Sequence, residues 1–548
     1  MRLGIDIGGT HTDGVLLKDK EILTTTKLPT ANNNLTKVII KTCRRLIEGY
    51  NSPAVDQITL STTLAANTII TKDYQKTGLL LIPGPGLKET WTDFPVKEIS
   101  GYTNHRGEVV EQIARKEVLA AVDELLSIGV EKIGVCAKFS PRNPQQELKV
   151  KKIIDNNFSR LDNISLSHQL TPNLNFPRRQ VTTYFNRAIY EAYQEFSTKL
   201  QAGFKELNLR APLYLLKADG GTMSLNKAEK RPVETINSGP SASIMGILTL
   251  TQQRENILGL DIGGTTTDIS LFIDRAPLFE PDGIKINNYD SSLRGLYNYS
   301  IGCGGDSLVR LKDNKLKIGP QRKGPAAALG GPAPTPTDAL ILLDEMELGS
   351  KTKAYQSLKP IAEKLALKPQ KTAQKIIEKF CQKIQTEVAK VIKSWENQPV
   401  YTINELLTDY KLNLDHLVGI GGPAQALVPK LAAELNLGYT IPQEAEIANA
   451  IGAAAARPTK AVKLYADTAQ GYYQFSQSSQ REKISSNFTL AEAKKTALNQ
   501  LTKAGYREEE IEITNTERFN LVRGFKTTGK ILAVTAQIKP GLEVEIDN

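Results

Sequence analysis

Residues 3–13 of the chain read LGIDIGGTHTD, and residues 258–268 read LGLDIGGTTTD. Nine of the eleven positions are identical, and an apolar run follows each copy. Each copy is predicted to form a strand, a tight Gly-Gly turn and a second strand, because glycine accepts turn conformations that other residues avoid. Such a turn presents backbone N–H groups that bind anions. Two hairpins of this kind, facing each other, would hold a nucleotide triphosphate.

Both repeats carry carboxylates at matching positions. Asp6 and Asp261 each end the first strand of a hairpin, where a carboxylate can hold Mg²⁺ through water. Asp13 and Asp268 are expected to orient threonine hydroxyls or to complete the metal site. Phosphoryl transfer depends mainly on positioning and charge neutralisation. Asp6 and Asp261 are therefore the predicted catalytic carboxylates, and Asp6, Asp261 and Asp268 the predicted metal ligands.

The turns of the repeats supply the predicted phosphate contacts. These are Gly8, Gly9, Thr10, Thr12, Gly263, Gly264, Thr265, Thr266 and Thr267. His11 replaces a threonine of the second copy, and it is predicted either to act as a catalytic acid or base or to remain a solvent-facing turn residue. Other glycine loops add three candidates, Asp219 and Asp306 as substrate or metal carboxylates and Cys303 as a nucleophile.

A third glycine loop, GIGGP at residues 419–423, follows the second repeat by about 160 residues and precedes a helix rich in small residues. In this order, Gly421 and Gly422 fit an adenosine-binding turn, where the absence of a side chain lets the backbone approach the nucleotide. The alternative is an ordinary strand-to-helix turn.

Strands and helices alternate through most of the chain, which is typical of an α/β fold. The expected domains are an N-terminal lobe at 1–170 and a second lobe at 171–460. The second lobe includes a helical insertion at about 350–410. From residue 461 the pattern changes to a helix followed by alternating strands, which predicts a small α+β module at 461–548.

Composition narrows the classes of function. The chain has 548 residues, of which 40% are hydrophobic and 23% charged, as in globular proteins of several domains. No apolar run of about 18 residues or signal-peptide pattern is found, so no membrane association and a cytoplasmic location are expected. The net charge of +10 is spread along the chain without a nucleic-acid-binding signature. It is expected to attract anionic substrates such as ATP rather than nucleic acid.

Two phosphate hairpins followed by a late adenosine turn resemble the actin-like (ribonuclease H-like) ATPase superfamily, which implies duplicated lobes. Within that superfamily the chain resembles the hydantoinase A / 5-oxoprolinase family. Besides the repeats, the resemblance rests on the stretches STTLAANT at 61–68, FSPRNP at 139–144, DGGTM at 219–223, SGP at 238–240, GCGGDS at 302–307 and TPTDA at 335–339. The chain departs from the family pattern at Leu60-Ser61, at His11 and at Asp306.

The resemblance implies an ATP- and Mg²⁺-dependent hydrolase that opens a cyclic amide such as hydantoin or 5-oxoproline. ATP would phosphorylate the carbonyl oxygen, and water would attack the activated carbon. Family members of this type often work with a hydantoinase B-type protein partner. The alternatives are a small-molecule kinase on the same fold and a regulatory ATPase module that binds another protein.

Overall fold

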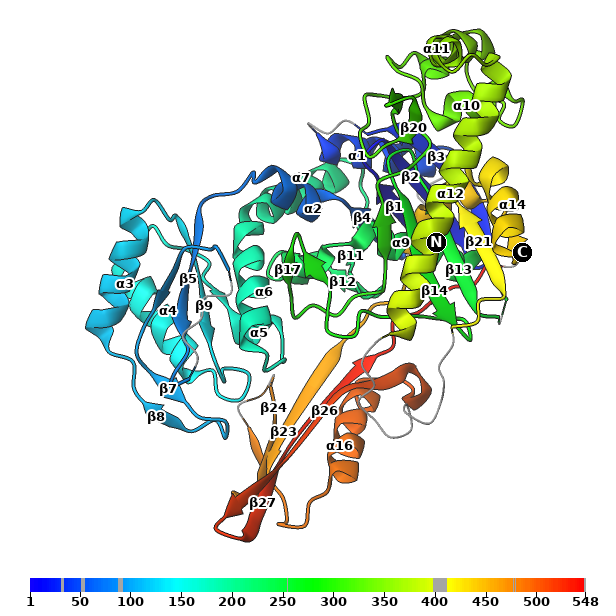
Figure 1. Ribbon diagram of the computed structural model, residues 1–548. Helices are drawn as coiled ribbons and strands as arrows, with labels where there is room; N and C mark the ends of the chain where they lie inside the picture. The colour runs from blue at the N-terminus through cyan, green and yellow to red at the C-terminus, as the bar shows by residue number, and fades with distance from the viewer. Residues whose placement is uncertain are drawn as a thin grey trace.

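The computed structural model describes residues 1–30, 34–50, 55–86, 92–253, 255–397, 412–476, 478 and 480–546. Figure 1 shows an α/β molecule in which two central sheets lie next to each other, a third sheet lies to one side and a fourth extends from the body. The two repeated hairpins belong to the two central sheets.

The first central sheet has the strand order β12-β11-β4-β1-β2-β3. Its strands are β1 (Arg2–Ile7), β2 (His11–Lys18), β3 (Glu21–Pro29), β4 (Gln57–Thr62), β11 (Leu213–Leu216) and β12 (Thr222–Ser224). The helices of this lobe include α1 (Leu35–Ile47), α2 (Leu64–Thr71), α6 (Phe176–Ala188) and α7 (Tyr190–Glu206). Apolar side chains of α1, α6 and α7 join those of the strands in one buried cluster.

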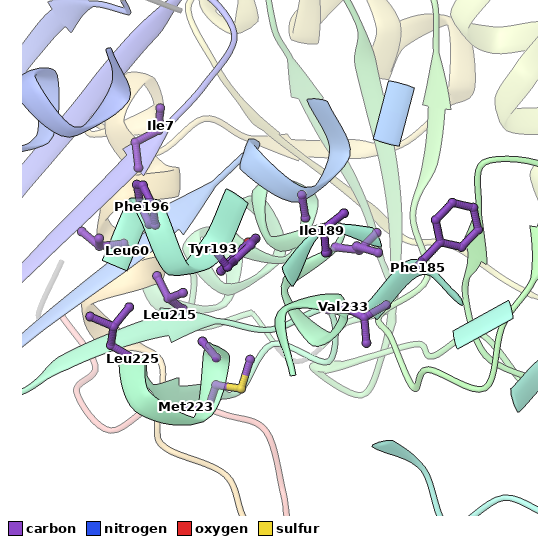
Figure 2. Packing of buried hydrophobic residues seen from close by; sticks show 14 of the residues in the cluster. Ile7, Leu60, Phe185, Ile189, Tyr193, Phe196, Leu215, Met223, Leu225 and Val233 are labelled. Carbon is purple, nitrogen blue, oxygen red and sulfur yellow. The ribbon is translucent and has the colours of Figure 1, made fainter. Parts of the chain in front are cut away.

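The expected boundary between the lobes at 170/171 is wrong. Strand β11 pairs in parallel with β4, so residues 213–216 complete the first sheet. Figure 2 shows Tyr193 and Phe196 of α7 packed with Leu60 and Leu215 of that sheet. The first central lobe therefore continues through residues 171–236, and the second begins near β13. The error arose because this pairing joins strands about 150 residues apart, which a local pattern does not reveal.

A separate parallel sheet is inserted between β4 and α6. Its order is β10-β9-β5-β6, formed by β5 (Thr77–Ile82), β6 (Val96–Glu98), β9 (Lys132–Ala137) and β10 (Ser165–Leu166). Helices α3 (Arg115–Ser127) and α4 (Gln145–Asn157) pack on it through their own apolar cluster. The region is drawn in blue to cyan in Figure 1 and carries none of the repeated motif.

The second central sheet has the order β15-β14-β13-β21-β22, with β18 paired to β14. Its strands are β13 (Ile257–Ile262), β14 (Thr267–Ile273), β15 (Ala276–Pro277), β18 (Tyr299–Ile301), β21 (His416–Ile420) and β22 (Gly438–Thr440). Its helices are α10 (Pro336–Leu342), α11 (Lys351–Lys364), α12 (Pro369–Glu396) and α14 (Ala424–Leu435). Helices α11 and α12 fall within the expected helical insertion, whose residues 398–411 lie outside the described residues.

The C-terminal module is an antiparallel sheet with one helix, in the order β25-β24-β23-β27-β26. Its elements are β23 (Ala461–Asp467), β24 (Tyr472–Phe475), β25 (Arg481–Lys483), α16 (Leu490–Thr502), β26 (Ile511–Arg523) and β27 (Lys526–Ile538). Thr489 and Glu492 form a capping box at the start of α16, which buries its alanines against β27. The strands β26 and β27 extend away from the two lobes in Figure 1.

Several other elements are short. They are β7 (Tyr102–Thr103), β8 (Val109–Glu111), α5 (Ser167–Leu170), α8 (Leu225–Ala228), β16 (Lys285–Ile286), β17 (Tyr289–Asp290), β19 (Val309–Lys312) and β20 (Lys315–Ile318). Among the helices that the structure describes, none has the length and apolar character needed to span a bilayer.

Helices α9 (Ser238–Leu250) and α15 (Ala448–Ala455) join the two lobes. They cross at glycines: a Cβ atom on Gly246 would lie 2.3 Å from the carbonyl oxygen of Ala448, and one on Gly452 would lie 2.2 Å from that of Ala242. Side chains of both helices share a buried cluster with strands of both hairpins, including Val15 of the first. This crossing brings the ends of β1 and β13 to the same helix, α15.

Candidate functional site

The two repeated segments fold as equivalent hairpins, which confirms the predicted strand–turn–strand structure. In the first, Asp6 faces Asp13 across the pair of strands, and in the second Asp261 faces Asp268. The turns close in the same way: the Gly8 N–H donates to the His11 carbonyl and the Gly263 N–H to the Thr266 carbonyl, each at 3.0 Å. The sequence repeat is thus a repeat of backbone geometry.

Asn449 connects the two hairpins at their carboxylates. Its side-chain Nδ2 lies 3.4 Å from Oδ2 of Asp6 and 3.3 Å from Oδ2 of Asp261, and it donates to both. The hydroxyl of Ser243 on α9 donates to the same Asp261 oxygen at 2.5 Å. Two carboxylates that are 255 positions apart in the chain therefore meet through one amide. This places the predicted catalytic pair, Asp6 and Asp261, in one site between the lobes.

The four carboxylates of the hairpins lie in an environment that opposes their charge. Burial raises the pKa of Asp6 to about 7, with further contributions from the charges of Asp13 and Asp261. Burial also raises the pKa of Asp13 and of Asp268 to about 6, and it raises the pKa of Asp261. A cluster of acids that resists ionisation gains free energy when a cation compensates its charge.

The carboxylates retain free ligand capacity. The Oδ1 atom of Asp6 is buried without a hydrogen-bond partner. A buried carboxylate oxygen in this state is costly unless a water or a cation is bound to it. Across the described ranges, no group of three or more His, Cys, Asp or Glu side chains lies close enough to hold a metal ion.

The threonines of the repeats divide into two groups. Thr12 and Thr267 are fully buried. The hydroxyl of Thr12 bonds to that of Thr30 at 2.9 Å, and that of Thr267 donates to the Cys303 carbonyl at 2.7 Å. The prediction that these two hydroxyls contact phosphate is therefore wrong, because both form hydrogen bonds inside the lobes. Thr10, Thr265 and Thr266 lie in the turns and are at least partly exposed.

The turn glycines also differ in their surroundings. A Cβ on Gly9 would have no heavy atom within 4 Å, whereas one on Gly8 would meet only the His11 carbonyl at 3.0 Å. In the second hairpin, a Cβ on Gly263 would meet the Thr266 carbonyl at 3.3 Å, and one on Gly264 would meet the Asp306 carboxylate at 2.9 Å. The first turn is thus open, and the second is backed by a loop that carries an acid.

His11 is exposed, and its ring nitrogen Nδ1 lies 3.2 Å from the Thr10 hydroxyl. Partial burial, with the charges of Lys27 and Arg322, lowers its pKa, while the charge of Asp306 opposes this shift. The imidazole is therefore mostly neutral near pH 7, and a neutral imidazole can accept a proton. Its neighbours come from both lobes, so His11 faces the space between them.

Asp306 joins the site through the loop that supports the second hairpin. Its backbone N–H donates to the Gly264 carbonyl at 2.6 Å, and Arg322 donates to its carboxylate through Nη2 at 3.0 Å. In the same loop, Cys303 is fully buried, and burial raises the pKa of its thiol to about 11. A nucleophilic cysteine needs a thiolate, so this environment opposes such a role.

The third glycine loop lies directly beside the second hairpin. Gly421 has φ +92°, and a Cβ on it would lie 2.4 Å from the Ile262 carbonyl and 3.0 Å from Oδ1 of Asp261. Gly422 has open space around its Cβ position. Gly421 is thus required for packing at the strand end, while Gly422 leaves the backbone accessible to a ligand.

Three polar residues of the site were missed by sequence reasoning. Asn449 lies in a helix of small residues, Ser243 lies in the apolar helix α9, and Lys27 lies on the edge strand β3. Lys27 Nζ is 3.3 Å from the Asp13 carboxylate. An isolated polar residue in an otherwise apolar helix was the available signal for Asn449. Ser243 is one of several hydroxyl residues of α9, so neither it nor Lys27 was marked in this way. Asp219 lies elsewhere, bonded to Lys217 and Gln537.

The raised pKa of Asp6 predicts a dependence of stability on pH. The unfolded carboxyl ionises near 3.8 and the folded one near 7. Between these values the folded state binds more protons, so its stability falls as the pH rises. For this fully buried group, the pKa shift lowers the free energy of unfolding at high pH by on the order of 4 kcal/mol. Asp6→Asn should therefore melt at a higher temperature than the wild type at pH 8 without nucleotide, and the difference should vanish toward pH 4. Thermal unfolding followed by circular dichroism measures this; equal melting temperatures at pH 8 would contradict it.

Two family models match the chain. The model described as hydantoinase/oxoprolinase N-terminal region matches residues 2–158, and the model described as hydantoinase/oxoprolinase matches residues 179–462. The first hairpin falls within the former match, and the second hairpin, Asn449 and the third glycine loop fall within the latter.

Individual proteins are similar over the same region. The chain is 25% identical to the caprolactamase subunit alpha of Pseudomonas jessenii over 387 residues, which cover 64% of this chain and 55% of that protein. It is 26% identical to the acetophenone carboxylase gamma subunit of Aromatoleum aromaticum over 396 residues, which cover 62% and 53%. The chain therefore spans about half the length of these relatives in the matches.

The fold is also similar to a solved structure. The crystal structure of ATP-dependent caprolactamase from Pseudomonas jessenii matches with a TM-score of 0.72 and 20% identity, covering 100% of this chain and 88% of that chain. This likeness concerns the fold, and together with the two equivalent hairpin sheets it confirms the predicted α/β class with duplicated lobes.

Proposed function

Because the chain belongs to the hydantoinase/oxoprolinase family, we propose that it is an ATP-dependent hydrolase that opens a cyclic amide. ATP would phosphorylate the amide carbonyl oxygen, and water would then attack the activated carbon. The observation that carries the proposal is the joint position of Asp6 and Asp261, held by Asn449 between the two Gly-Gly turns. This arrangement offers anion-binding backbone on both sides of a carboxylate pair.

Relatives support the type of chemistry. Caprolactam carries an amide carbonyl and acetophenone a ketone, so both named relatives act on carbonyl compounds. An amide is a poor electrophile because its nitrogen shares electrons with the carbonyl. Phosphorylation of the oxygen makes the carbonyl carbon more electrophilic and turns the oxygen into a leaving group. A single ATP-dependent activation of a carbonyl oxygen would thus serve the family, with the substrate set by each member.

The residues present fit a divalent cation. Asp6 and Asp261 would hold it, directly or through water, because one Asp6 oxygen lacks a partner and burial disfavours the uncompensated charge of all four acids. Asp268, the third expected contributor, faces Asp261 across the hairpin and has its pKa raised to about 6. It would act on the ion through water, because no three acids of the described residues lie close enough to hold it directly. When bound, Mg²⁺ supplies charge neutralisation for the phosphates during transfer.

Backbone and side-chain groups of the site would act as follows. The N–H groups of the turns at Gly9 and Gly264, with the hydroxyls of Thr10, Thr265 and Thr266, would bind the phosphates, and the loop at Gly422 would lie against the adenosine. The carbonyl oxygen of the amide attacks the γ-phosphorus, and ADP leaves. His11, which is mostly neutral near pH 7, accepts a proton from the attacking water. The carbon–nitrogen bond then breaks, the proton passes to the leaving nitrogen, and an acyl phosphate remains. A second water hydrolyses the acyl phosphate, which gives the ring-opened carboxylic acid and phosphate beside the ADP already released.

A protein partner is part of the proposal. The two named relatives are subunits, and the chain spans about half of their length in the matches. We expect a hydantoinase B-type protein to complete the hydrolytic half of the reaction. The proposed location is the cytoplasm, where ATP is available.

The test is ATP hydrolysis in the presence of cyclic amides. Purified chain, alone and with the hydantoinase B-type protein from the same organism, is incubated with MgATP and ε-caprolactam, hydantoin or 5-oxoproline. One of these compounds should raise the release of phosphate at least about tenfold, with the ring-opened product in equal amount. Stimulation by none of them, with and without the partner, contradicts the proposal. A stable phosphorylated product seen by ³¹P NMR would instead show a small-molecule kinase.

A further inference from the structure

One cavity among the described residues lies away from the two hairpins. It measures about 1,030 Å³ and is lined by three parts of the chain. Residues 170–234 of the first lobe form one wall, and strands β23, β26 and β27 of the C-terminal module form another. The third wall is residues 279–294, which follow the second hairpin in the chain and pack on the apolar cluster of the first lobe. None of the residues of the Gly-Gly turns lines it. Its size suits a metabolite rather than a single ion.

The charge of the lining favours an anion. Seven lysines or arginines and five acidic residues line the cavity. Four of the five acids already have a basic partner, namely Asp219 with Lys217, Glu234 with Arg231, Asp282 with Arg178 and Glu517 with Arg142. Lys227, Lys230 and Lys460, by contrast, have no carboxylate within ion-pair distance in the part of the chain that the structure describes. The cavity therefore has unneutralised positive charge.

Unpaired hydroxyls add hydrogen-bonding capacity to the same cavity. Ser292, Thr459 and Thr535 line it, and each has a side-chain oxygen that is buried without a hydrogen-bond partner. Thr535 is only 6% exposed. A buried hydroxyl without a partner costs about 1–3 kcal/mol, which a ligand with acceptor oxygens recovers after the side chain rotates.

Asp219, in the wall of the cavity, is held by three hydrogen bonds. Asp219 accepts hydrogen bonds from the Gly221 N–H, from Lys217 and from Gln537 of β27, at 2.9 to 3.0 Å. The charges of Lys217 and Arg294 lower its pKa against the effect of burial, so it stays ionised. Asp219 thus fixes the C-terminal sheet against the first lobe, and its own charge is satisfied. Lys227, Lys230 and Lys460 are therefore the cationic side chains available to a ligand.

We propose that this cavity binds a small molecule with at least two anionic groups, carboxylates or phosphates, held by Lys227, Lys230 and Lys460. The site is separate from the nucleotide site of the proposed function and does not depend on it. One anionic group would contact Lys227 and Lys230, which are close in sequence, and the other Lys460 at the start of the C-terminal module. The module then has a defined role, which is to form one wall of this site.

Isothermal titration calorimetry of the full chain tests the proposal. Citrate, glutarate and inorganic phosphate are titrated at constant ionic strength, without Mg²⁺ and with saturating ADP, so that the hairpins are not the site measured. Acetate serves as the monoanion. We expect saturable binding of citrate or glutarate and none of acetate. Binding of citrate or glutarate supports the proposal and indicates a polycarboxylate. Binding of phosphate alone indicates a site for one phosphate group and contradicts the requirement for two anionic groups.

Two triple variants, each of which removes three lysine charges, test where the probe binds. K227Q/K230Q/K460Q should weaken the best probe at least tenfold and leave the affinity for ADP unchanged. K371Q/K375Q/K379Q removes the same charge from the exposed face of α12 and should bind the probe as the wild type does. Absence of saturable binding by every multivalent probe overturns the proposal. Equal weakening in both triple variants also overturns it, because it would reflect net charge alone.

Discussion

Asp261→Ala is expected to reduce ATP hydrolysis by about 10³-fold or more, because it removes a carboxylate that both lobes share. Asp261 accepts hydrogen bonds from Ser243 of α9 and from Asn449 of α15, and Asn449 also donates to Asp6. The variant loses a cation ligand and the link between the two hairpins together. Steady-state release of phosphate from MgATP measures the effect.

The fold of this variant should persist. Burial raises the pKa of Asp261, so the ionised side chain opposes folding when no cation is present. Its removal should leave the melting temperature of the nucleotide-free protein unchanged or higher. Asp123→Ala, at an exposed position of α3, is the matched control and should keep wild-type turnover. Wild-type turnover in folded Asp261→Ala would show that the phosphate chemistry lies elsewhere.

Gly246→Ala should damage both stability and turnover, although it adds a single methyl group. The added carbon would lie 2.3 Å from the carbonyl oxygen of Ala448, which is backbone of α15 and has no side-chain freedom to yield. The helices must therefore move apart. Overpacking of this kind costs about 1–3 kcal/mol. Since Asn449 follows Ala448 directly, the shift also displaces the amide that joins Asp6 and Asp261.

Gly239→Ala is the control for the same helix. A Cβ on Gly239 has no heavy atom within 4 Å, so this variant should be stable and active. Both substitutions replace a glycine of α9 by alanine. A difference in stability or turnover between the two variants therefore reports on the crossing with α15. Denaturant unfolding and phosphate release are measured for both. If Gly246→Ala matches Gly239→Ala in stability and turnover, the tight crossing does not position the site.

Local sequence patterns predicted the hairpins, the strand before the third glycine loop and the C-terminal α+β module. Each depends on residues close in sequence: the Gly-Gly turn between two apolar runs, or Thr489 and Glu492 at the start of a helix. These signals survive in the structure because a turn or a cap is decided within a few residues. The departures His11 and Asp306 were visible in the same way, but their proximity was not.

Sequence reasoning was less successful for side chains whose partners are distant. Thr12 and Thr267 have the composition of phosphate ligands, yet their hydroxyls bond to Thr30 and to the Cys303 carbonyl inside the lobes. The boundary at residue 170 failed because β11 returns to pair with β4. Asn449 had no repeat or motif to mark it, and only its position on α15 makes it central.

The sequence by itself determined the duplicated hairpin, the family and the residue types of the candidate site, because these are written in short runs of glycine, threonine and aspartate. The tertiary structure decided which of those residues meet. The glycine crossing of α9 and α15 brings Asp6 and Asp261 to one amide, and the C-terminal strands create the cationic cavity. Both depend on contacts between segments hundreds of residues apart, which are set by the close packing of the whole chain and not by any local pattern.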